Sequence, residues 1–153
     1  MSANVYLNAI GTAVPDHDAH NAFIGWAQPK IADPRLAKLF GRMVARSGIE
    51  HRWTVLPHAD DGGSPIGPGG FYEGGFMPGT DARMRVYADA APALSLDAID
   101  RLAEQVEIDR ITHLVLASCT GFVAPGVDQI IARRLGLTPS VERLLVGFMG
   151  CYA

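Results

Sequence analysis

The residue type best suited to covalent chemistry in this 153-residue chain is cysteine, which occurs twice, at Cys119 and Cys151. Cys151 follows the apolar run 144–149 and Gly150, a pattern that favours a buried strand ending in a bend. A helix that begins just after a thiol lowers its pKa, and the thiolate is the nucleophilic form. A single cysteine beside an apolar strand is more commonly a small core residue, so the interpretation of Cys151 as a nucleophile depends on the surrounding sequence.

A row of basic side chains is the second feature that could serve a chemical function. Lys38, Arg42 and Arg46 are spaced four residues apart, which places them on one face of a helix. Guanidinium groups bind phosphate oxygens bidentately, so such a row suits a phosphate-bearing ligand. A solvated helix face has the same pattern, and the spacing alone does not decide between the two interpretations.

The helix that would carry this row is the clearest in the sequence and spans residues 34–47. Asp33 can cap its first turn, Pro34 suits the first helical position, and Gly48 is a typical C-terminal stop. Its apolar residues follow the spacing of a stripe buried against the rest of the protein: Leu36, Leu39, Phe40, Met43 and Val44.

Other elements alternate along the chain in a way that predicts an α/β fold with a mostly parallel sheet covered by helices. We expect strands at 5–10, 111–117 and from Val141 onward, an extended segment at 49–56, and helices at 20–28, 81–107 (with a break near Pro92) and 127–135. Residues 57–80 hold eight glycines and four prolines, which predicts a long loop without regular structure.

Composition excludes several functional classes. Hydrophobic residues make up 48% and charged residues 19% of the chain, and the net charge of −3 does not favour nucleic acid as a partner. Two cysteines form neither a disulfide framework nor a zinc motif, and His17 with His20 is better explained as a polar loop and helix start than as a metal site. We find no signal peptide and no membrane-spanning run, and therefore expect a cytoplasmic protein with reduced thiols.

Four segments together resemble one family. The segments GFMGCYA from Gly147, ITHLVLASCTG from Ile111, PGVD from Pro125 and LGLTPSV from Leu135 are similar, in order and spacing, to type III polyketide synthases, the chalcone synthase family. The resemblance runs from about Tyr6 to the last residue. It implies a thiolase-like fold, with residues 1–153 as the first of two related halves, the C-terminal half absent from this chain, and a homodimer.

The same resemblance assigns roles to individual residues. It implies that Cys151 is the nucleophile and that Arg42 and Arg46 hold the phosphates of coenzyme A; the third family position, a lysine, is Leu39 here, with Lys38 beside it. It further implies that Cys119, Thr120 and Ala124 line the acyl pocket. Ala124 stands where chalcone synthases carry a methionine that reaches into the partner's cavity, so that cavity should be larger or differently shaped.

The reaction implied is acyl transfer. A type III polyketide synthase condenses a starter acyl-CoA with malonyl-CoA by decarboxylative Claisen condensation, through an acyl group held on the cysteine and with no cofactor beyond the CoA thioesters. The His and Asn that assist the family's enolate belong to the half that this chain lacks, so the 153 residues alone are not expected to condense. Two alternatives stay open: a ketoacyl synthase of the fatty-acid initiation type, whose usual Ala-Cys-Ala-Gly motif fits Cys151 less well, and a non-catalytic half that only binds or dimerises.

Overall fold

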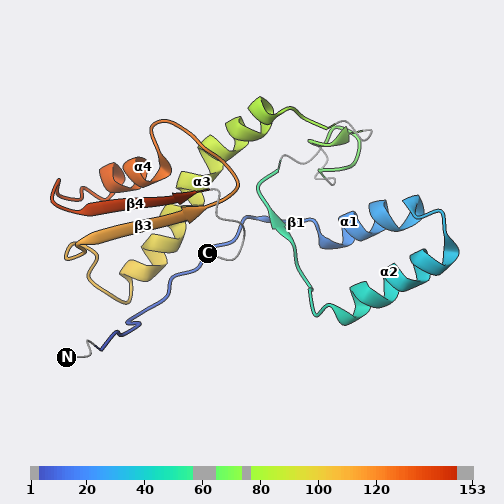
Figure 1. Cartoon of the computed structure of the whole chain (residues 1–153), viewed down its shortest axis with the longest axis horizontal. Helices are drawn as coiled ribbons and strands as arrows, with labels where there is room; N and C mark the ends of the chain where they lie inside the picture. The colour runs from blue at the N-terminus through green and yellow to red at the C-terminus, as the bar shows by residue number, and fades with distance from the viewer. Residues whose placement is uncertain (1–3, 57–64, 74–76, 148–153) are drawn as a thin grey trace. The chain divides into compact units, whose positions relative to one another are not determined.

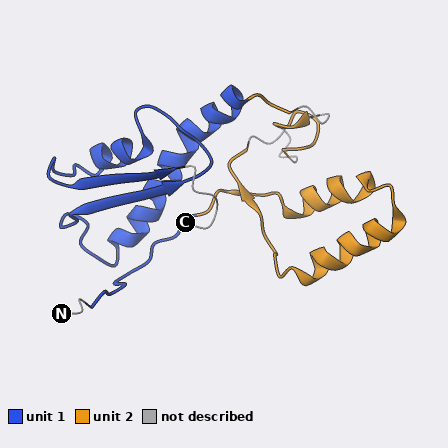
Figure 2. Cartoon of the chain, viewed as in Figure 1, with its two compact units in different colours: residues 1–13, 80–153 blue, residues 14–79 orange. Residues whose placement is uncertain are grey.

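The structure is a computed structural model that describes residues 4–56, 65–73 and 77–147. The chain divides into two units, of which unit 1 comprises residues 1–13 and 80–153 and unit 2 comprises residues 14–79 (Figure 2). None of the helices in the described part of the chain is long and apolar enough to cross a membrane.

Unit 1 is built around a strand–helix–strand motif (Figure 1). Strand β3 (His113–Ser118) leads through helix α4 (Val127–Arg134) to strand β4 (Glu142–Gly147), and the two strands pair in parallel from His113↔Glu142 to Ser118↔Gly147. Parallel strands need a crossover connection, and the amphipathic segment between them supplies it. The predicted parallel strands and intervening helix are therefore confirmed.

Helix α4 carries the centre of the unit 1 core. It packs on β3, on β4 and on helix α3 (Thr80–Ala103). Val127 and Ile131 are buried, with Ile131 only 1% exposed, and Gly136 follows the helical region at φ +64°. Asp128 in the first turn is also buried, and the Arg143 guanidinium on β4 donates to its carboxylate at 2.8 Å. A buried charge needs such a partner. Because Asp128 lies on α4 and Arg143 lies on β4, this ion pair joins the helix to the sheet.

Within the described residues, the second face of this sheet is open, contrary to the expectation of a sheet covered by helices. Val115 is 62% exposed and Leu144 is 58% exposed. Strands of parallel sheets are usually covered on both faces, which explains why their sequence is apolar throughout. The apolar pattern thus predicts the strands correctly, but the described chain supplies a cover for one face only.

Two other expectations for unit 1 are corrected by the structure. Residues 5–10 form no strand, because a strand requires a neighbour for its backbone hydrogen bonds, and the described β3–β4 sheet offers this segment none. Helix α3 continues through Pro92 without the expected break and ends at Ala103 rather than at residue 107. Proline leaves one carbonyl of the preceding turn without its usual partner, and the helix nevertheless continues through Pro92, which is buried.

Unit 2 combines short strands with two helices. Strand β1 (His17–Asp18) pairs antiparallel with β2 (Trp53–Thr54), which lies in the segment predicted to be extended. Helix α1 (His20–Ala27) agrees with the predicted helix at 20–28 and is followed by the 3₁₀ turn η1 (Gln28–Lys30), which contains Pro29. In the predicted loop 57–80, the described residues 65–73 and 77–79 form turns and irregular chain.

Helix α2 (Pro34–Arg46) has the predicted ends but not the predicted burial. Asp33 Oδ1 accepts the Arg35 N–H at 2.7 Å, and Gly48 follows the helix at φ +67°. The expected buried stripe is wrong for this chain, since Leu36 is 55% and Met43 63% exposed. An apolar stripe shows which face favours burial, but the described part of unit 2 places little against it.

Candidate functional site

The turn that follows β3 holds three of the predicted site residues. Cys119 and Thr120 come directly after the strand, Ala124 follows three residues after Gly121, and all three are exposed. Ser118, the last residue of β3, pairs with Gly147, the last residue of β4. Both strands therefore end at the same edge of the sheet, where side chains from separate parts of the sequence can meet.

Cys151 lies outside the described residues, as does the segment 148–150 that precedes it. The structure describes β4 up to Gly147. The nucleophilic role of Cys151 stays a prediction.

The basic row is present on unit 2. Lys38, Arg42 and Arg46 all lie on α2 and are exposed, with Arg46 in the last turn. In the described ranges no carboxylate lies within ion-pair distance of these three side chains. The row therefore presents uncompensated positive charge to solvent, which suits both a phosphate ligand and a solvated face.

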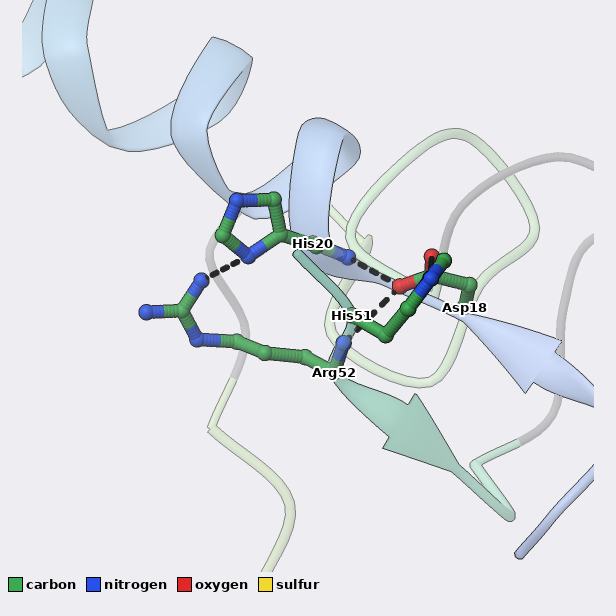
Figure 3. A network of polar contacts seen from close by, with 4 residues as sticks. All are labelled: Asp18, His20, His51 and Arg52. Carbon is green, nitrogen blue, oxygen red and sulfur yellow. Dashed lines mark hydrogen bonds and ion pairs between the residues drawn. The ribbon is translucent and has the colours of Figure 1, made fainter. Parts of the chain in front are cut away.

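Sequence reasoning missed a polar network in unit 2 that is centred on Asp18 (Figure 3). Asp18 Oδ1 accepts the backbone N–H groups of His20 and Arg52, each at 2.9 Å, and Asp18 Oδ2 lies 2.8 Å from His51 Nδ1. The Arg52 guanidinium contacts His20 Nδ1. One carboxylate thus joins the start of α1 to the segment that enters β2, although the two segments are more than thirty positions apart.

These contacts hold the Asp18 carboxylate in its ionised form. The Arg52 backbone N–H, followed by His51 and the His20 backbone N–H, keeps the pKa of Asp18 well below its ordinary value. Both carboxylate oxygens are engaged by neighbours within unit 2, so we interpret the arrangement as structural. The acidic Asp18 and the basic His51–Arg52 dipeptide are complementary in charge. Because they lie more than thirty positions apart, the sequence did not indicate that they are in contact.

Unit 2 also contains an apolar pocket of about 310 Å³. Its walls are mostly aromatic and aliphatic, and they comprise Ala19, Phe23, Trp26, Arg52, Thr54, Leu56, Pro65, Ile66, Tyr72 and Met77. Among the described residues, no group of three or more His, Cys, Asp or Glu side chains is arranged to hold a metal ion. A metal site at His17 and His20 gains no support from the position of His20, which is buried with Nδ1 against Arg52.

Tyr87 is a site neighbour that the sequence did not reveal. It lies on α3, and its hydroxyl shares a hydrogen bond of 2.8 Å with Ser118 Oγ at the end of β3. Nothing in the helical pattern of α3 distinguishes this tyrosine from a core residue, because the contact depends on how α3 lies beside the strand end.

Comparison with known proteins found a matching family model and similar relatives. Residues 2–153 match the family model for the N-terminal domain of chalcone and stilbene synthases. Residues of this chain are 44% identical over 73 positions to the alpha-pyrone synthesis polyketide synthase-like Pks18 of Mycobacterium tuberculosis and of Mycobacterium bovis. That alignment covers 46% of this chain and 19% of the relative.

A solved structure shares the fold. The crystal structure of PKS-I from the brown alga Ectocarpus siliculosus superposes with a TM-score of 0.69 at 29% sequence identity, over 94% of this chain and 38% of the algal chain. The chain thus spans well under half the length of the relatives that it matches. It belongs to the chalcone and stilbene synthase family, as the N-terminal portion of a type III polyketide synthase with a thiolase-like fold.

Proposed function

We propose that the protein containing this chain is an acyltransferase that condenses a starter acyl-CoA with malonyl-CoA, with Cys151 as its nucleophile. The observation that carries the proposal is the parallel register of β3 and β4, which ends both strands at one edge of the sheet. Four residues after Gly147, Cys151 can lie at most about 14 Å from that edge, because an extended chain spans about 3.5 Å per residue. Chain geometry is therefore compatible with a nucleophile close to the Cys119–Thr120 turn.

The chemistry begins with the thiolate. Cys151 Sγ attacks the thioester carbonyl of the starter, the C–S bond to coenzyme A breaks, and the acyl group becomes bound to the protein. Malonyl-CoA then loses carbon dioxide to give an enolate, whose carbon attacks the bound acyl carbonyl. A carbon–carbon bond forms and the cysteine thiolate leaves. The enolate oxygen needs a donor during this step, and by resemblance a His and an Asn outside these 153 residues supply it.

The basic row would bind the substrate's phosphates. Arg42 and Arg46 present guanidinium groups on the exposed face of α2, and Lys38 extends the row by one turn. In the described residues no carboxylate neutralises them, so their charge is available to an anion. We assign the coenzyme A phosphates to this row, and we assign no further cofactor.

The pocket walls and the assembly complete the proposal. Cys119, Thr120 and Ala124 would face the acyl chain, with Cys119 as a wall residue rather than a reagent. We infer a homodimer in which the small Ala124 leaves space where chalcone synthases place a methionine. Free thiols persist in a compartment that keeps them reduced, so we infer a cytoplasmic location.

The test is acylation followed by mass spectrometry on protein expressed from the complete reading frame. Incubation with hexanoyl-CoA should add one hexanoyl group, located by peptide mapping on Cys151. Cys151→Ala should abolish the adduct, whereas Cys119→Ser should retain it. In the same assay Arg42→Gln with Arg46→Gln should raise the acyl-CoA concentration for half-maximal acylation about tenfold, because two charge-assisted contacts are lost.

The matched control for the basic row is Arg133→Gln with Arg134→Gln, which removes two exposed cations from the last turn of α4 instead of α2. It should leave the half-maximal concentration unchanged. An adduct on Cys119 that persists in Cys151→Ala would refute the assignment of roles. Equal effects of the two double changes would remove the row from the site.

A further inference from the structure

The turn after β3 is contacted at both of its ends by one side chain. The Tyr87 hydroxyl shares a 2.8 Å hydrogen bond with Ser118 Oγ, immediately before Cys119. The Tyr87 ring lies against Gly121, immediately after Thr120. Cys119 and Thr120 are thus the two residues between the anchor points.

The contact with Gly121 is too close for any other residue. A Cβ at position 121 would lie 2.3 Å from both Cγ and Cδ1 of the Tyr87 ring and 2.7 Å from its Cε1. Gly121 is not in the left-handed region of φ, so glycine is required here for space rather than for backbone conformation. A side chain at position 121 would therefore force the Tyr87 ring or the turn to shift.

Tyr87 lies on a rigid helix, so it is well placed to hold the turn after β3 in position. It lies in the first half of the 24-residue helix α3, which packs on α4 and is thereby connected to the sheet. Both the tyrosine and Ser118 are half-buried, so the hydrogen bond is only partly in competition with water. A turn of exposed residues therefore receives its position from a helical residue about thirty positions earlier in the sequence.

We propose that Tyr87 is a positioning residue that fixes the Cys119–Thr120 wall and thereby sets which acyl chains the pocket selects. The inference rests on the proposed function, since it assumes that this wall faces the acyl group. Tyr87 itself does not touch the reacting atoms. Its hydroxyl orients the start of the turn, and its ring limits how closely the end of the turn approaches α3.

The experiment compares Tyr87→Phe with wild type in the complete protein. A net hydrogen bond of ordinary strength corresponds to roughly a threefold to tenfold effect. The ratio of kcat/KM for the preferred starter to that for a starter four carbons longer or shorter should fall about fivefold in Tyr87→Phe. Tyr6→Phe, which removes the hydroxyl of an exposed tyrosine in the same unit, should leave the ratio within twofold.

A second readout does not depend on catalysis. Alkylation of Cys119 by iodoacetamide, followed by peptide mapping, should change its rate at least threefold in Tyr87→Phe and not in Tyr6→Phe. Gly121→Ala should lower the unfolding midpoint, and Tyr87→Ala combined with it should recover part of that loss, because the shorter side chain makes room for the added methyl group.

The outcomes separate the two proposals. Unchanged starter ratio and unchanged Cys119 labelling in Tyr87→Phe would overturn the inference, as would additive losses in the Gly121 and Tyr87 double variant. A wild-type protein that is never acylated on Cys151 would overturn the proposed function and the selectivity role with it. Cys119 labelling and the double variant would still decide whether Tyr87 positions the turn.

Discussion

The two units differ in what holds their candidate site residues. In unit 1 the turn with Cys119 and Thr120 is held by strand register, by the ring of Tyr87 and by the buried face of α4. In unit 2 the described helix α2 exposes its basic row and much of its apolar stripe, and the strands are only two residues long. Contacts around one carboxylate, Asp18, join the start of α1 to the segment that enters β2.

This difference matches what each candidate site would need. A pocket wall must keep its shape to select among acyl chains, so it benefits from close packing on a sheet edge. A phosphate-binding row recognises charge, and long flexible basic side chains on an exposed helix meet that need without a rigid pocket. We therefore expect that mutations in unit 1 change stability mainly through packing. Mutations in unit 2 should change stability mainly through polar contacts.

The largest effect is expected in the core of unit 1. Ile131→Ala removes a side chain that is 1% exposed and should lower the free energy of unfolding by about 3 kcal/mol, through lost burial and the cavity that remains. Val115→Ala, on the open sheet face, should cost no more than about 0.5 kcal/mol. Urea denaturation measures both. Similar losses for the two variants would show that the open face is covered in solution.

A glycine-to-alanine pair should have opposite signs in the two units. A Cβ on Gly11 would lie 2.2 Å from the Ala98 carbonyl oxygen and 2.7 Å from the Leu102 nitrogen, both backbone atoms of α3, so Gly11→Ala should destabilise unit 1 by about 1–3 kcal/mol. Gly25 lies inside α1, and a Cβ added there would meet nothing within 4 Å, so Gly25→Ala should stabilise unit 2 by about 0.5–1 kcal/mol. Thermal denaturation measures the stability of each variant, and hydrogen exchange shows which of the two units has changed. A loss of stability in Gly25→Ala would mean that α1 has a neighbour absent from the described chain.

The smallest effect is a dependence of unit 2 on pH. The folded state lowers the pKa of Asp18, so its contribution to stability is fully present above about pH 4 and is lost as the pH falls further. Both tryptophans, Trp26 and Trp53, belong to unit 2, so their fluorescence reports its unfolding. Asp18→Asn should lower the unfolding midpoint at pH 7 and weaken its decrease as the pH falls from about 4 to about 2.

The control for that experiment is Asp16→Asn, the same change two residues earlier at an exposed position. It should retain the wild-type acid dependence. Acid dependence that is unchanged in Asp18→Asn would show that another group is responsible.

Local chemistry made much of the fold predictable. The cap at Asp33, the stop at Gly48 and the apolar spacing of residues 127–135 depend on neighbours in the sequence, and these elements formed where predicted. The expected strand at 5–10 and the buried stripe of α2 failed for a shared reason. Both require a partner surface, and a periodic pattern shows the preference for a partner without providing one.

The sequence by itself determined the family and the α/β alternation, because motif order and helix signals are properties of short segments. Only the tertiary structure decided which distant residues meet. The Asp18–Arg52 contact and the contacts of Tyr87 with Ser118 and Gly121 each join positions more than thirty residues apart. Such contacts depend on how the elements pack in space, and the spacing of residues along the chain does not predict that packing.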